Sequence, residues 1–118
     1  MSNPTTDEDL PVFVRWTEFV KWLLPTTEKF PKRLRFTFSS RIDNLALDVV
    51  EDLVEARYAR HKVECLKAIN LKLERLRVLL RICHDMQYLP HKNFEFAMRS
   101  LDEVGRMVGG WIKQQERA

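Results

Sequence analysis

The sequence predicts an all-α protein, built as an up-and-down bundle of four helices. Three observations lead to this fold class. Apolar residues recur at spacings of three and four in four separate stretches, which is the period of one helical face. Prolines separate several of these stretches, and no segment alternates apolar and polar residues for long enough to form a strand. The chain has 118 residues, room for one modest core, so the four helices are expected to share it.

The first helix is predicted from about residue 11 to Pro25, or to the end of the turn after it. Pro11 suits the first turn of a helix, and polar residues that could cap the helix stand just before it. The capping candidates are Thr6, Asp7 and Asp9, and the apolar face carries Val12, Trp16, Phe19 and Leu23.

The second helix is predicted to start at the Phe30-Pro31 pair, because proline disfavours helix at the preceding residue and suits a first helical turn. No glycine or proline marks its end, so the boundary with the third helix is placed near residues 60–62. Its apolar face would carry Phe38, Ile42, Leu45, Val49, Leu53 and Ala56.

The third helix has the most regular pattern and is predicted from Val63 to Met86, roughly 36 Å at 1.5 Å per residue. Pro90 separates it from a fourth helix. The apolar face of the third helix would carry Leu66, Ile69, Leu73, Leu76, Leu80 and Cys83, and that of the fourth Phe94, Ala97, Leu101, Val104, Val108 and Trp111.

These elements predict one domain over residues 11–115, preceded by a flexible segment over residues 1–10. That segment is polar and acidic, and no run in the chain approaches the roughly 18 apolar residues of a membrane span. We therefore expect a cytoplasmic protein that does not associate with membranes. Cys65 and Cys83 lack the spacing of a zinc site and are interpreted as buried thiols, so neither a metal nor another cofactor is expected.

The net charge is only +3, but the charges are segregated along the chain. Residues 29–41 contain five basic residues and no acidic one, whereas residues 42–55 contain five acidic residues and no basic one. Between Arg57 and Arg81 there are eight basic and two acidic residues. Basic and acidic surfaces are therefore expected on one molecule.

All three glycines lie in the last predicted helix, at positions 105, 109 and 110. Each glycine inside a helix costs about 1 kcal/mol relative to alanine, which calls for an offsetting contact. Gly105 and Gly109 would form a smooth groove on one flank of the apolar face, where another helix of the same or a second chain could approach. The alternative is a helix end with Gly109 and Gly110 as its cap. Trp111 favours continued packing, because tryptophan is seldom left in solvent.

Three segments carry a resemblance to a known family: LLPTTEKFPK (residues 23–32), AINLKLERLRVLLR (residues 68–81) and LDEVGRMVGGWIK (residues 101–113). In this order and spacing they resemble Avd, the accessory variability determinant of diversity-generating retroelements. A looser likeness links the chain to the four-helix proteins encoded in ribosomal RNA intervening sequences, whose role is unknown, through the Phe-Pro start of the second helix. The VGGWIK ending favours Avd.

The resemblance implies a four-helix protein that assembles as a homopentameric barrel and performs no chemistry itself. It also implies that the barrel binds RNA and DNA with little sequence preference and associates with the reverse transcriptase of the retroelement. That polymerase copies a template RNA into mutated cDNA, a process that the accessory protein supports.

Two basic sets are candidates for contact with nucleic acid or with the polymerase. The alternative for the first is that its members pair with the acids of the second helix, Asp48, Asp52 and Glu55. The first set flanks the apolar face of the third helix and comprises Lys72, Arg75, Arg77 and Arg81; the second lies at the start of the second helix and comprises Lys29, Lys32, Arg33 and Arg35.

One pattern in the sequence suggests an enzymatic alternative. Six residues separate Arg77 from His84, a spacing that resembles the Arg-His motif of HEPN ribonucleases. In that motif, histidine would act in acid–base catalysis and arginine would stabilise the phosphate. Such motifs usually carry a polar residue after the arginine, where this chain has Val78. No nucleophile or phosphate-binding loop supports catalysis elsewhere, so we expect no enzymatic activity.

Overall fold

The fold is an antiparallel bundle of four helices. In the computed structural model, residues 9–117 are described, and this range contains helices and no strand. The four long helices are α1 (Asp9–Glu28), α2 (Ser40–Tyr58), α3 (Lys62–Asp85) and α4 (His91–Arg117). Two short pieces precede α2: the 3₁₀ turn η1 (Lys32–Leu34) and the π-helical turn η2 (Arg35–Ser39). The predicted all-α four-helix class is confirmed.

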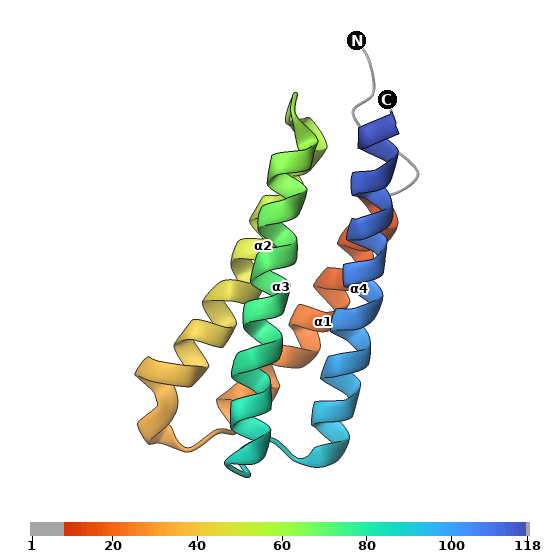
Figure 1. Ribbon diagram of the computed structural model, residues 1–118. Coiled ribbons are helices and arrows are strands. Elements are labelled where there is room, and N and C mark those ends of the chain that lie inside the picture. The colour runs from red at the N-terminus through yellow and green to blue at the C-terminus, as the bar shows by residue number, and fades with distance from the viewer. Residues whose placement is uncertain (1–8, 118) are drawn as a thin grey trace.

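Successive helices run in opposite directions, so the start of α1 and the end of α4 lie at the same end of the bundle (Figure 1). Each helix packs on the next one, and α1 also packs on α4, which closes the bundle around one core. The molecule is elongated, with extents of 49 × 22 × 20 Å. None of the helices in the described range is long and apolar enough to cross a membrane.

The observed helix ends agree with most of the predicted ones. Helix α1 ends in the turn after Pro25, and the α2–α3 junction falls at residues 59–61. Lys62 stabilises that junction, because its ammonium group donates hydrogen bonds to the carbonyls of Ala56 and Arg57 at 2.8 and 2.7 Å. Most of the predicted N-terminal segment, residues 1–8 with the capping candidates Thr6 and Asp7, lies outside the described residues, and α1 already includes Asp9 and Leu10.

The core follows the predicted apolar faces of α1, α3 and α4 completely. The face of α2 differs in one respect, since Ala46 is fully buried while the predicted Leu45 is only partly buried. The reason is the neighbouring indole of Trp16, which is fully buried and donates a hydrogen bond from Nε1 to the carbonyl of Ala46 at 2.9 Å. A small side chain at residue 46 allows α1 and α2 to approach closely enough for this bond.

The start of the second helix is the part of the fold that departs from a regular α-helix. Pro31 precedes a 3₁₀ turn in which the amide of Leu34 donates to the carbonyl of Pro31 at 2.9 Å. A π-helical turn follows, and such a turn adds a residue to the helical repeat and rotates the side chains that flank it. The predicted core residue Phe38 is consequently only partly buried, and Phe36 points into solvent.

Candidate nucleic-acid interface

The second candidate set of basic residues lies at one corner of the bundle, between the end of α1 and the start of α2. We call Lys29, Lys32, Arg33 and Arg35 the basic corner. All four side chains are exposed. Arg33 also fixes the corner to the α3–α4 turn, because its guanidinium donates a hydrogen bond to the Tyr88 hydroxyl at 2.9 Å and lies 5.5 Å from the centre of the Tyr88 ring. The structure therefore keeps these four predicted residues together.

The first candidate set, on α3, is not kept together. Lys72 is mostly buried and bonds the carboxylate of Asp52 on α2, at 2.5 Å from Nζ to Oδ2. The alternative of pairing with the acids of the second helix therefore holds for Lys72. An ammonium group held in this way is not available to a phosphate without breaking a contact between α2 and α3.

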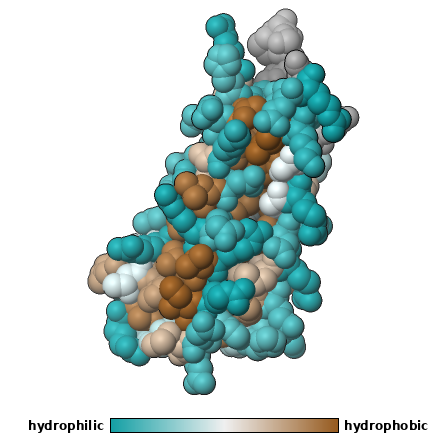
Figure 2. All heavy atoms as spheres, viewed as in Figure 1, coloured by the Kyte–Doolittle hydropathy of each residue, from teal (hydrophilic) through white to brown (hydrophobic). Residues whose placement is uncertain are grey.

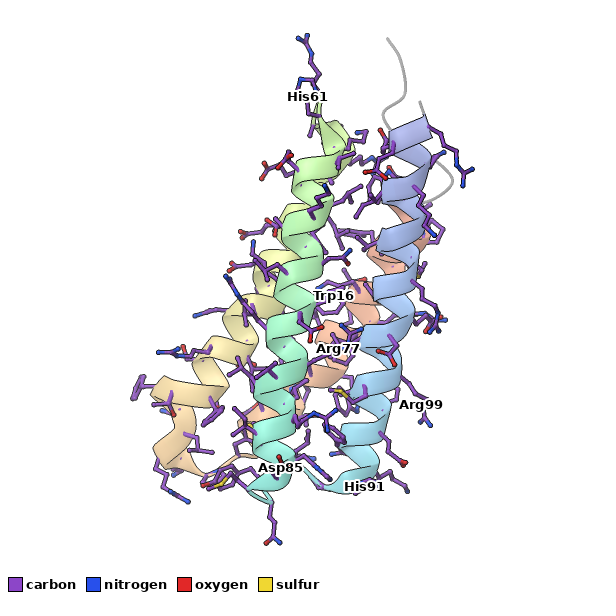
Figure 3. The ribbon with its side chains drawn as sticks, viewed as in Figure 1. Trp16, His61, Arg77, Asp85, His91 and Arg99 are labelled. Atoms are coloured by element: carbon purple, nitrogen blue, oxygen red, sulfur yellow. The ribbon has the colours of Figure 1, made fainter. Side chains whose placement is uncertain are left out.

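Arg77 has a similar structural role between α3 and α4 (Figure 3). Its guanidinium donates to Asp102 of α4 at 2.9 Å and to Glu74 of α3 at 3.1 Å, and its side chain is 27% exposed. Gly105 lies beside it: a Cβ at residue 105 would stand 3.4 Å from Nη2 of Arg77. A methyl group there would make an ordinary van der Waals contact with the flexible end of the arginine, so Arg77 can cross from α3 to α4 without a glycine at residue 105.

Two members of the α3 set keep exposed guanidinium groups. Arg81 lies over the ring of Phe94, 5.3 Å from its centre, and faces α4. Arg75 lies on the opposite side of α3 and lines a groove of about 600 Å³ between α2 and α3. Because Arg75 and Arg81 face different sides, the set does not form a single basic patch.

The groove beside Arg75 is a feature that the sequence reasoning missed. Its walls include the apolar side chains of Leu45, Leu71, Val78 and Leu79, and charges of both signs stand at its edges. Figure 2 shows hydrophobic side chains gathered over this part of the α2–α3 face. The signal was present in the sequence, since Leu71, Val78 and Ile82 follow one another at spacings of seven and four outside the core face.

The other two glycines have different surroundings from Gly105. A Cβ at Gly109 or Gly110 would meet no heavy atom within 4 Å, and α4 continues past both residues to Arg117. The interpretation of Gly109 and Gly110 as a helix cap is therefore wrong. The prediction that another helix of the same chain approaches Gly109 closely is also wrong. Trp111 is fully buried, as predicted.

Gly110→Ala is expected to raise the free energy of unfolding by about 0.5–1 kcal/mol, because alanine loses less conformational entropy in a helix and meets no obstacle here. The same gain is expected for Gly109→Ala in the isolated bundle. Urea unfolding measures both. If a second subunit packs against Gly109, the added methyl group would instead weaken self-association, which light scattering detects, while Gly110→Ala serves as the matched control.

The structure does not bring Arg77 and His84, the two residues of the ribonuclease-like motif, into one site. His84 bonds His91, with 3.1 Å between Nε2 and Nδ1, and stacks on Phe94 with ring centres 4.2 Å apart. Arg77 bonds Asp102 and Glu74 instead. The two side chains thus belong to separate sets of contacts, at the end and in the middle of the α3–α4 seam.

The two thiols are poor nucleophiles. Burial raises the pKa of Cys83 to about 11, so its thiol stays protonated at neutral pH. Burial also raises the pKa of Cys65, with the nearby carboxylates of Glu55 and Asp52 acting in the same direction. Among residues 9–117, no group of three or more histidine, cysteine or acidic side chains is arranged to hold a metal ion.

Comparison with known protein families gives a match along the bundle. A family model described as bAvd-like matches residues 12–115, which include the whole of α2 and α3 and all but the start of α1 and the end of α4. No curated protein matches the chain at a significant level of sequence similarity.

Proposed function

Because the chain belongs to the bAvd-like family, we propose that it is the noncatalytic accessory protein of a diversity-generating retroelement. In this proposal it forms a homo-oligomer that binds RNA and DNA and the reverse transcriptase, and thereby supports mutagenic cDNA synthesis. The observation that carries the proposal is the family match along the whole four-helix domain. The subunit number, five, comes from the likeness to Avd.

The basic corner supports the nucleic-acid part of this proposal. Its four cationic side chains are exposed, and the sequence from Lys29 to Arg41 supplies no acid that could neutralise them. Such a surface attracts phosphates and displaces their counterions, with little dependence on base sequence. Several copies in one assembly would place several corners along the same nucleic acid and multiply the affinity.

The groove between α2 and α3 supports the oligomeric part. Its exposed leucine and valine side chains are flanked by Arg41 and Arg75 and also by Asp48 and Glu74. The two acids would repel phosphates, whereas apolar side chains with charges of both signs at the rim are typical of protein interfaces. We therefore assign Arg75 to a protein contact, with another subunit or with the reverse transcriptase, rather than to RNA.

The experiment that tests the proposal measures mass and RNA affinity on one preparation. By light scattering the wild-type protein is expected to have several times the 14.1 kDa mass of one chain, and by fluorescence anisotropy to bind single-stranded RNA more weakly as salt rises. Val78→Asp, in the apolar groove, is expected to produce the monomer and to weaken RNA binding through lost avidity.

Val14→Asp is the matched control, because Val14 is a similarly exposed valine on α1, away from the groove. It should keep the wild-type mass and affinity. The purified reverse transcriptase of the same retroelement should be retained by the immobilised wild-type protein. A wild-type chain that is monomeric and ignores RNA even at low salt would contradict the proposal.

A further inference from the structure

A second concave surface adjoins the basic corner. It is an open cleft of about 550 Å³ between the end of α1, the turns η1 and η2, and the first half of α2. Its apolar walls include Leu24, Phe30 and Leu47, and Lys32 and Arg35 of the basic corner stand at its edge. The cleft therefore combines apolar surface with adjacent cationic side chains.

Phe36 is the most exposed large apolar side chain of the described residues and lines this cleft, with 86% of its surface in solvent. The π-helical turn η2 causes this exposure, because it rotates residue 36 away from the core that its neighbours Leu34 and Phe38 approach. Such turns are frequent at functional sites. An exposed aromatic ring that lines one cleft with two exposed basic residues has the composition of a platform for stacking nucleic-acid bases.

We propose that the cleft receives one unpaired base of a single-stranded nucleic acid, which stacks on Phe36 while Lys32 and Arg35 contact the flanking phosphates. This inference rests on the proposed function and adds to it a preference for single strands and a residue that produces it. A base inside a duplex is already stacked and paired on both faces, so its ring is not available to Phe36.

The charges inside the cleft agree with a base rather than a phosphate as occupant. Two carboxylates, Glu28 and Asp43, line the cleft, and they would repel a phosphate group. The edges of adenine, cytosine and guanine carry N–H donors that a carboxylate accepts. Phosphates are therefore expected at the rim, beside Lys32 and Arg35, with the base directed inward.

Asp43 is held in place for such a contact. Its Oδ1 accepts a hydrogen bond from the hydroxyl of Thr27 at 2.7 Å, which links α1 to α2 at the floor of the cleft. Burial raises the pKa of Asp43, and the bond from Thr27 opposes that shift. A partly desolvated carboxylate gains from an added N–H donor, because burial has removed some of its hydration.

The exposed ring of Phe36 and the two cations together favour nucleic acid over a protein as the occupant of the cleft. An apolar side chain of a protein partner would fill the apolar walls equally well, but it would bring no anion of its own to Lys32 and Arg35. A nucleic-acid strand satisfies the ring and both cations at once, since each base carries its own phosphate.

The test compares Phe36→Ala with wild type on a fluorescent single-stranded RNA and on the duplex of the same sequence, at one salt concentration. Loss of one stacked base is expected to weaken single-strand binding about 5- to 100-fold and to leave duplex binding within about twofold. Phe36→Trp should restore single-strand affinity, and its indole fluorescence should be quenched when the RNA binds. Circular dichroism checks the fold, which a residue this exposed should leave unchanged.

Tyr58→Ala is the matched control, because Tyr58 is also an exposed aromatic residue, 67% in solvent, but lies at the end of α2 far along the chain from the cleft. Its affinity should equal that of wild type. Equal losses on single strand and duplex, or no loss at all, would overturn the inference. So would a Phe36→Ala protein that binds RNA normally but no longer retains the reverse transcriptase. If wild type itself binds neither nucleic acid, the proposed function fails instead.

Discussion

Trp16→Ala is expected to lower the free energy of unfolding by about 3–5 kcal/mol, the usual cost of removing a large aromatic side chain from a core. Trp16 is 0% exposed, lies 5.1 Å from the Phe19 ring between centres, and donates the hydrogen bond that joins α1 to the Ala46 carbonyl of α2. Domains of this kind have a total stability of about 5–15 kcal/mol, so the variant loses a large fraction of it. Urea unfolding followed by circular dichroism measures the shift in midpoint.

Two further variants show how much of this loss of stability comes from the buried volume of the indole and how much from its hydrogen bond to the Ala46 carbonyl. Trp16→Phe keeps most of the ring and loses the bond to Ala46, so its cost is expected to be clearly smaller. Trp22→Ala removes an indole that is only partly buried, with its ring centre 4.6 Å from that of Phe96, and should also cost less. Each measurement needs several protein concentrations, because self-association would add to the apparent stability. An unchanged midpoint for Trp16→Ala would contradict the observed core.

The four helices were predictable because each carries a long apolar face of constant period. All of the predicted face residues of α3, from Leu66 to Cys83, and of α4, from Phe94 to Trp111, are buried. In a helix, the spacing of three and four decides which side chains share a face, and this information is local. The order of the helices then follows from short connections, which bring neighbours together in antiparallel pairs.

The irregular turns were not predictable from the same local rules. The π-helical turn that exposes Phe36 has no local sequence signature, and because of it the predicted core residue Phe38 is only partly buried against the core. At the end of α3, Gln87 adopts φ = 67°, and the amide of Tyr88 donates to the carbonyl of Cys83 at 2.8 Å. Glycine usually occupies this left-handed position, so a glutamine there gives no warning of the helix end.

The candidate site shows a further limit of sequence reasoning. Basic residues could be counted, but whether each is paired depends on acids that are distant in the chain. Lys72 meets Asp52, 20 residues away, and Arg77 meets Asp102, 25 residues away. Reversing the charge of Arg77 would therefore disturb the α3–α4 seam as well as any ligand. The basic corner is a cleaner test, because none of its four side chains takes part in an ion pair within residues 9–117.

The double variant Lys32→Glu, Arg35→Glu is expected to weaken binding to single-stranded RNA on the order of 100-fold at low salt, if each side chain makes one charge-assisted contact with a phosphate. Lys32 and Arg35 are chosen because both are exposed. Arg33 is left unchanged, because it donates a hydrogen bond to the Tyr88 hydroxyl and its loss would alter the structure of the corner. Fluorescence anisotropy over a series of salt concentrations gives both the affinity and its salt dependence. The slope of log affinity against log salt should become shallower by about two, one unit for each lost phosphate contact.

Net charge alone would predict a different result, and a second variant distinguishes the two explanations. Lys21→Glu with Lys113→Glu changes the net charge by the same amount, at exposed positions on α1 and α4. If binding depended only on the overall field, both double variants would lose the same affinity and the same slope. Because phosphate contacts act at short range and are screened within about 10 Å at 0.1 M salt, we expect the control to lose far less. Phe36→Ala should lower the affinity without changing the slope of log affinity against log salt, since stacking releases no counterion. If wild type and the Lys32→Glu, Arg35→Glu variant had equal slopes, the basic corner would not be part of the nucleic-acid interface.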